Sequence, residues 1–205
     1  MKGRHTHLEV TAYHEAGHVL AALKVGQYVE DVSIDRRNPG NGLTWRRSPR
    51  RNPYTLSINP ELAWRHTFRA TVDEMFISLA GPIAEAKLLG KPIRDLGSYS
   101  DYTTCLVSGL RLLHLAEFAR DYTNIPPIDL EQLLSSTRDN TKRWIGRAKI
   151  WPLVESIAKG LLLSGHINGQ DLAFSMGSAL GAHQLYLQRE KPSTFAALRW
   201  YSLSG

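Results

Sequence analysis

Two histidines and a glutamate near the N-terminus have the types and the spacing of a catalytic metal site. His14, Glu15 and His18 form a His-Glu-x-x-His sequence, and on a helix the two histidines lie one turn apart on the same face. Both imidazoles can then bind one zinc ion through neutral ring nitrogens. Glu15 lies further around the helix, where its carboxylate can take a proton from a water molecule that the metal activates.

The residues around this sequence favour a metal site over an accidental match. The alternative is a surface helix with two unrelated histidines and a solvated glutamate. The segment is instead mostly apolar, with Tyr13 inside it and Val19 and Leu20 directly after His18, and polar groups in an apolar helix need a partner. We therefore expect one zinc ion per chain.

The elements that must position these residues are mostly helical. A helix is predicted over residues 7–26, ended by Gly26. Alternating apolar and polar residues predict a strand over 29–35, and a turn at 38–42 leads to a return strand over 43–46. The other predicted helices start at residue 60 and cover 71–89, 102–122, 129–144 and 149–163. We therefore predict a mainly α fold with a small β-hairpin or sheet directly after the metal-binding helix.

Several segments resemble the FtsH-type zinc metallopeptidases. Residues 11–18, Thr-Ala-Tyr-His-Glu-Ala-Gly-His, are similar to the active-site helix of that family. Residues 42–45 match its Gly-x-Thr-Trp pattern, and residues 80–85 stand where the family has Gly-Gly-Arg-Ala-Ala-Glu. Residues 154–172 resemble its closing helices. Pro82 departs from the family pattern, and we interpret it as a tolerated kink in a helix.

The extent of the resemblance suggests the domain organisation. It runs over residues 11–172, with clear motifs and weaker similarity between them. We therefore predict an FtsH-like peptidase domain over residues 1–172. Residues 173–205 carry no motif, and we expect this C-terminal extension to pack on the domain or on a partner.

Two histidines do not complete a catalytic zinc site, which normally has three protein ligands. A third histidine six residues after His18 is absent, because Lys24 stands there. A glutamate from a later helix would leave Glu74 and Glu85 as candidates. The resemblance instead implies Asp101, which follows a Gly/Ser/Thr-rich segment at the start of a helix. An aspartate at a helix start is also favoured by the helix dipole, and the two roles are compatible.

Two further groups of site residues follow from the same resemblance. Gly42, Leu43 and Thr44 are candidate substrate-binding residues, because metalloproteases commonly bind an extended peptide along a sheet edge. The alternative is an ordinary hairpin whose Trp45 packs on the core. Glu85 is a candidate hydrogen-bond partner of one ligand histidine, and the alternative is a surface carboxylate.

The charge distribution indicates which kinds of partner the protein could bind. The chain of 205 residues carries a net charge of +6, and Arg46, Arg47, Arg50 and Arg51 lie in a segment over 46–60 that we predict to be a loop. We interpret this loop as solvated, although such a cluster can attract nucleic acid, anionic lipid or acidic peptide. Nucleic acid is not the partner we expect, because aromatic residues are scarcely interleaved with the arginines.

The cysteine and hydropathy patterns predict a cytoplasmic protein. Cys105 is the single cysteine, which excludes an intrachain disulfide and favours a reducing compartment. No apolar run is long enough to span a bilayer, and the polar N-terminus does not resemble a signal peptide. We therefore expect a soluble, intracellular protein without a membrane span.

The resemblance implies a zinc endopeptidase in which Glu15 is the general base and His14, His18 and Asp101 bind zinc. FtsH-type proteases also carry a membrane anchor and an ATPase module, whereas this sequence contains no Gly-x-x-x-x-Gly-Lys-Ser/Thr loop. We expect ATP-independent cleavage of extended or unfolded protein segments, unless a separate ATPase or adaptor delivers the substrate. The family's hexamer depends on its ATPase ring, so we expect a monomer or small oligomer here.

Two other functions stay open. One is a site-specific regulatory protease that cuts a single protein. The other is a non-catalytic binding module, in which zinc holds the fold or a partner and the basic 46–51 loop binds an acidic surface or nucleic acid. The complete motif favours the enzyme, because a structural zinc site has no need of Glu15.

Overall fold

The computed structural model describes residues 5–47, 60–93, 96, 99–121 and 124–175. The elements are α1 (His7–Lys24), β1 (Tyr28–Ile34), β2 (Gly42–Arg47), α3 (Pro60–Leu89), α4 (Tyr99–Arg120), α5 (Leu130–Gly146), α6 (Trp151–Ser164), β3 (His166–Asn168) and α7 (Gly169–Ser175). The chain divides into two compact units, Met1–Gly169 and Gln170–Gly205. Most of the predicted extension, residues 176–205, lies outside the described residues.

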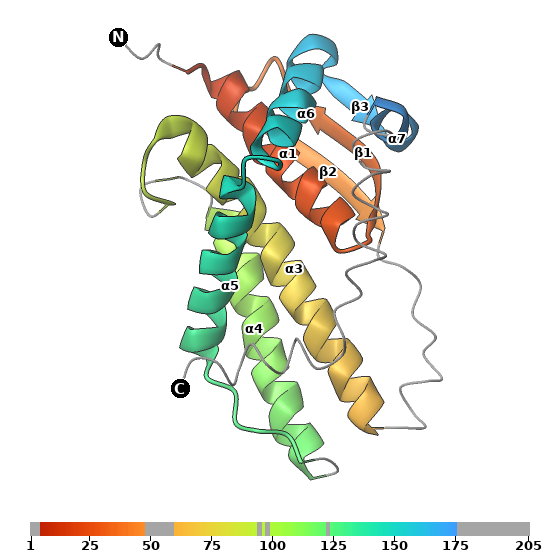
Figure 1. Cartoon of the computed structure of the whole chain (residues 1–205), viewed down its shortest axis with the longest axis vertical. Helices are drawn as coiled ribbons and strands as arrows, with labels where there is room; N and C mark the ends of the chain where they lie inside the picture. The colour runs from red at the N-terminus through yellow and green to blue at the C-terminus, as the bar shows by residue number, and fades with distance from the viewer. Residues whose placement is uncertain (1–4, 48–59, 94–95, 97–98, 122–123, 176–205) are drawn as a thin grey trace. The chain divides into compact units, whose positions relative to one another are not determined.

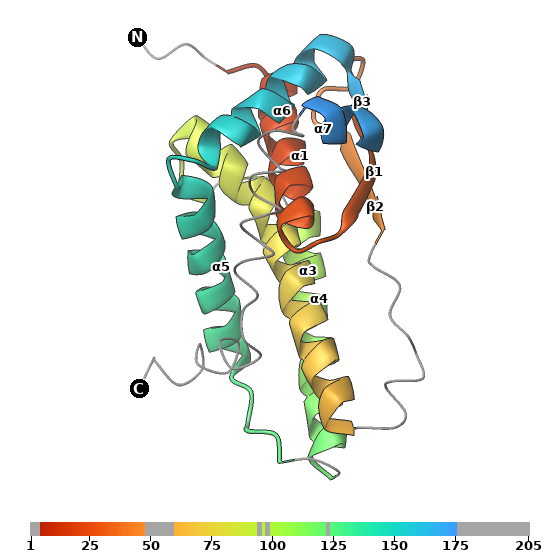
Figure 2. The ribbon, with the colours of Figure 1, turned by 45° about the vertical axis from the view of Figure 1, so that its right-hand side comes forward.

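The first unit is mainly α with a small sheet, which confirms the predicted fold class. Its three strands form an antiparallel sheet in the order β2-β1-β3, and α1 lies against the sheet, α3 and α6 (Figures 1 and 2). The predicted turn between the first two strands is present, and Gly40 in it has a φ of 114°. The sequence did not predict β3, which pairs with residues 31–33 of β1. No helix in the described ranges is long and apolar enough to cross a membrane.

The helix that carries the two histidines, α1, is buried on most of its surface. Thr6 caps its N-terminus by accepting a hydrogen bond from the backbone N–H of Glu9, and Val25 follows its last turn. Ala16, Val19 and Leu20 are buried because α3, α6 and β1 surround the helix. An apolar helix that is covered on several sides explains why its sequence lacks a simple polar face.

A single long helix, α3, crosses α1. It runs without a break from Pro60 to Leu89, so the predicted start at residue 60 and the predicted helix over 71–89 belong to one element. Gly17 of α1 meets it closely, since a Cβ built on Gly17 would lie 2.5 Å from the carbonyl oxygen of Ala80. Only a glycine permits this approach, and the approach brings the histidines of α1 against α3.

The return strand predicted over 43–46 is present and extends to Arg47, so the predicted loop over 46–60 begins too early. Arg46 and Arg47 belong to β2, and the guanidinium of Arg46 donates to Gln27 and forms an ion pair with Glu74. This arginine therefore ties β2 to α3 and is not part of a solvated cluster. Arg50 and Arg51 lie outside the described residues.

Candidate metal centre

Two helices bring the three predicted ligands together. The spacing of four residues places His14 and His18 on one face of α1, and Asp101 comes from the first turn of α4. The Nε2 atoms of the histidines lie 3.0 Å apart, and Asp101 Oδ2 lies 3.0 Å from His14 Nε2. Asp101 Oδ1 lies 3.5 Å from His18 Nε2. In the described part of the chain this cluster is the group of ligating side chains that could hold a metal ion.

The ligand atoms lie close enough together to hold one metal ion. Ligand atoms bound at about 2.0–2.2 Å to a tetrahedral zinc lie roughly 3.3–3.6 Å from one another. In the cluster, His14 Nε2 lies 3.0 Å from His18 Nε2 and 3.0 Å from Asp101 Oδ2, whereas His18 Nε2 contacts the other oxygen, Oδ1, at 3.5 Å. One ligand atom from each of the three residues lies within 4.8 Å of the other two. Two imidazole nitrogens and one carboxylate are also a common ligand set of catalytic zinc.

The other ring nitrogen of each histidine has a partner that sets its tautomer. His18 Nδ1 lies 2.8 Å from the carbonyl oxygen of Ile77, and His14 Nδ1 lies 3.1 Å from Glu85 Oε2. Both partners accept hydrogen bonds, so Nδ1 carries the proton and Nε2 is free to ligate. The structure thus places Glu85 beside a ligand histidine, where the sequence analysis expected it, and orients both rings through α3.

The charged groups of the cluster stabilise a positive charge. Burial lowers the pKa of His14, but hydrogen bonds with Asp101 and Glu85 outweigh it and raise this pKa to about 9. Burial also raises the pKa of Asp101, and the two histidines more than compensate, so that this pKa falls below its ordinary value. The centre therefore stabilises positive charge, which a proton on His14 or a metal ion can supply.

A glycine missed as a site residue makes room for both imidazoles. A Cβ built on Gly81 of α3 would lie 2.4 Å from His18 Nε2 and 2.8 Å from His14 Nε2. Gly81 was not among the predicted site residues, whereas the structure places it directly behind the ligand atoms. The visible signal was a glycine in the middle of a strong helical pattern, which has a packing or functional reason more often than not.

The general-base candidate, Glu15, lies on the face of α1 next to the two histidines and is directed at β2. Glu15 is 6% exposed, and its Oε2 accepts a hydrogen bond of 2.6 Å from the hydroxyl of Thr44 on β2. A Cβ built on Gly42 would lie 2.5 Å from Glu15 Oε1. Glu15 is therefore enclosed by the strand that we predicted to bind substrate.

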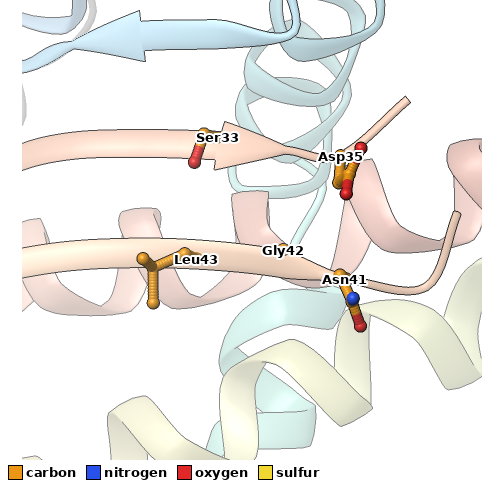
Figure 3. A pocket seen from close by; sticks show the side chains of 5 residues that line it. All are labelled: Ser33, Asp35, Asn41, Gly42 and Leu43. Atoms are coloured by element: carbon orange, nitrogen blue, oxygen red, sulfur yellow. The ribbon is translucent and has the colours of Figure 1, made fainter. Parts of the chain in front are cut away.

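The predicted substrate strand has two different faces. Leu43 and Trp45 are 50% and 58% exposed, so the alternative in which Trp45 packs on the core is wrong. Gly42 and Thr44 instead lie toward Glu15. The strand is at the edge of the sheet, and a hollow of about 130 Å³ beside it is lined by Ser33, Asp35, Asn41, Gly42 and Leu43 (Figure 3).

The other carboxylate considered as a third ligand lies elsewhere. Glu74 of α3 pairs with Arg46, and it is not part of the cluster formed by the two histidines and Asp101. A glutamate-ligated site built on Glu74 is therefore excluded. Glu85 contacts His14 at Nδ1, on the opposite side of the ring from the nitrogen that faces Asp101.

Comparison with known proteins supplies no relative. No family model matches the chain, and no curated protein matches it. The resemblance to FtsH-type peptidases therefore stays a prediction, and the geometry of the site is the evidence for a function.

Proposed function

We propose that this protein is a zinc-dependent endopeptidase of FtsH-like type, which hydrolyses peptide bonds in extended or unfolded protein segments without ATP. His14, His18 and Asp101 would hold one zinc ion, and Glu15 would act as general base. The observation that carries the proposal is the convergence of these three ligand atoms beside a buried glutamate.

Each group around the centre would have a separate role in hydrolysis. A zinc ion bound by the cluster would lower the pKa of a water molecule and polarise a peptide carbonyl. Glu15 would accept a proton from the attacking water and then donate it to the leaving amine. Glu85 and the carbonyl of Ile77 hold the two imidazoles in the tautomer that ligation requires.

The exposed edge of β2 suits an extended substrate. A peptide added along a sheet edge gains main-chain hydrogen bonds without a demand for a particular sequence. Leu43 and Trp45 present apolar surface beside that edge, and the hollow at Gly42 and Leu43 offers room for a side chain (Figure 3). We therefore propose that Leu43 and the backbone of β2 contact the substrate.

A specific observation weakens the alternative binding module. Its basic surface was expected to include Arg46, but that side chain is engaged by Glu74 and Gln27. A purely structural zinc site would also leave the burial of Glu15 next to the ligands without a purpose. A site-specific regulatory protease would use the same chemistry and differs only in its substrate.

The remaining proposals concern the cellular compartment, the oligomeric state and the partners of the protein. The single cysteine, Cys105, is buried as a free thiol, which suits the reducing cytoplasm. We propose a monomer or small oligomer, with a separate ATPase or adaptor as a partner if folded proteins are among the substrates.

Cleavage of casein tests the function. Zinc-loaded wild type and Glu15→Gln would be compared, with metal content quantified in both and Glu61→Gln on the exposed start of α3 as a matched control. We expect equal zinc in all three proteins and cleavage only by wild type and the control, with a loss of about 10³-fold or more in Glu15→Gln. No cleavage by wild type with one bound zinc would favour a dedicated substrate or a binding role, and no bound zinc would overturn the site.

A further inference from the structure

We infer that Thr44 is a positioning residue for the general base Glu15, so that β2 holds the catalytic carboxylate as well as offering an edge to substrate. This inference rests on the proposed function. It also corrects the role expected for Thr44, which the sequence analysis placed among the residues that contact substrate.

The contact itself is short and charge-assisted. The Thr44 hydroxyl donates to Glu15 Oε2 over 2.6 Å, within the 2.5–2.7 Å range expected for a hydroxyl bound to an ionised carboxylate. Glu15 is buried, so water competes poorly for this oxygen. A hydrogen bond of this kind restricts the rotation of a side chain that otherwise has several rotamers.

The strand geometry explains why Thr44 faces inward. Side chains alternate along a strand, and Leu43 and Trp45 on either side of Thr44 are both about half exposed to solvent. Thr44 pairs with Val32 of the central strand β1, which is fully buried. The Thr44 hydroxyl is therefore directed at Glu15, whereas the side chains of its two neighbours in the strand face solvent.

The strand that carries Thr44 is anchored on both sides of it. Arg46 joins β2 to Glu74 of α3 and to Gln27. Gly42 lies so close to Glu15 that a Cβ there would be 2.5 Å from the Cγ and Oε1 atoms of the glutamate. Glu15 is thus held between a glycine that leaves it room and a hydroxyl that engages Oε2, while Oε1 lies over the glycine.

Kinetics of two substitutions at position 44 test the inference. Thr44→Val keeps the shape but removes the donor, and Thr44→Ser keeps the donor. We expect Thr44→Val to lower kcat about 10- to 100-fold with KM changed less than about twofold, because a misplaced catalytic group costs rate and not affinity. Thr44→Ser should recover kcat to within about threefold of wild type. Thr71→Val, which removes a hydroxyl that donates within α3, is the matched control and should retain wild-type kinetics.

A second measurement is independent of activity. The denaturation midpoints of metal-free wild type, Thr44→Val, Glu15→Leu and the double variant form a double-mutant cycle. If the hydroxyl binds the carboxylate, Thr44→Val lowers the midpoint in the wild-type background and has a clearly smaller effect in the Glu15→Leu background. Additive shifts would overturn the inference.

The outcomes separate this inference from the proposed function. Wild type that binds zinc but cleaves nothing would overturn the proposed function, and the double-mutant cycle would still decide whether Thr44 holds Glu15. A raised KM with unchanged kcat in Thr44→Val would return Thr44 to substrate binding and overturn the inference. Equal loss of kcat in Thr44→Ser and Thr44→Val would also overturn it, because the methyl group and not the hydroxyl would then matter.

Discussion

Two neighbouring faces of α1 hold their functional groups in different ways. On one side, His14 and His18 face α3 and α4, and three carboxylate or carbonyl groups surround their ring nitrogens. On the neighbouring face, Glu15 is directed at β2, where it contacts the hydroxyl of Thr44 and lies close to Gly42. The ligand side is a network of charged groups that stabilises positive charge. On the base side, within the described residues, Glu15 has one hydrogen bond and close packing against Gly42.

This difference predicts two kinds of failure. Charged groups buried together are strongly coupled, so damage on the ligand side should affect metal binding, stability and activity at once. Damage on the base side should reduce the rate and leave the metal in place. A variant of either face that combined these two outcomes would show that the two faces are coupled.

Removal of Asp101 should have the largest effect. Asp101→Ala deletes the third ligand and the acceptor of His14, so we expect zinc affinity to fall at least about 100-fold and casein cleavage at least about 1,000-fold. Metal analysis after dialysis and a cleavage assay measure both. Asp139→Ala, on the exposed face of α5, is the control. Stoichiometric zinc with full activity in Asp101→Ala would remove Asp101 from the site.

The next effect is the pH dependence of the metal-free protein. The pKa of His14 is raised from 6.5 to about 9, so its contribution to stability is complete below pH 6.5 and is lost as pH rises through 9. Asp101 has a lowered pKa, so its contribution is present above about pH 4 and is lost in more acidic solution. We expect the free energy of unfolding to fall by up to about 3 kcal/mol between pH 6.5 and pH 9.

Zinc provides the control for this pH effect. Metal binding replaces the proton on His14, so the zinc-loaded protein should lose little stability over the same pH range. Urea denaturation at several pH values, with zinc and with a chelator, makes the comparison. Equal pH profiles for the two forms would contradict the charge balance described for the cluster.

A methyl group at position 81 should damage the ligand side through space alone. In Gly81→Ala the new Cβ would collide with both Nε2 atoms, and we expect zinc affinity to fall about 100-fold, with a loss of about 1–3 kcal/mol in stability from overpacking. Calorimetric zinc titration and denaturation measure these changes. Gly146→Ala is the control, because nothing lies within 4 Å of a Cβ built there.

The smallest effect is expected on the base side. Gly42→Ala would push against the Glu15 carboxylate, and we expect cleavage to fall about 10- to 50-fold through displacement of the base. Zinc affinity should stay within about twofold of wild type, because the ligand atoms face the other helices. Loss of zinc in Gly42→Ala would show that the two faces of α1 do not act separately.

Local sequence patterns were sufficient to predict the helices and strands whose formation depends on residues close together in the chain. The period of the apolar residues predicted the helices, and the alternation over 29–35 predicted β1. The spacing of His14 and His18 placed them on one face because helix geometry relates residues four apart in any helix. Asp101, from a distant segment, was reached through the resemblance and not through spacing.

Long-range pairing was not visible in the sequence. The strand β3 has three residues, too few for a periodic signal, and it exists because β1 offers it an edge. The sequence analysis grouped Arg46, the last residue of a predicted strand, with the arginines of a basic loop. Its partner Glu74 lies far along the chain and could not be identified from the sequence. Neither charge pairing nor edge pairing leaves a local pattern.

The sequence by itself determined a mainly α fold and a helix that carries two histidines on one face, and it indicated the residue types of a candidate metal site. The tertiary structure decided what faces each of these residues. Gly81 behind the imidazoles and Thr44 on the carboxylate of Glu15 depend on how closely α3 and β2 approach α1. Such distances follow from the packing of whole elements, and a residue type alone does not specify them.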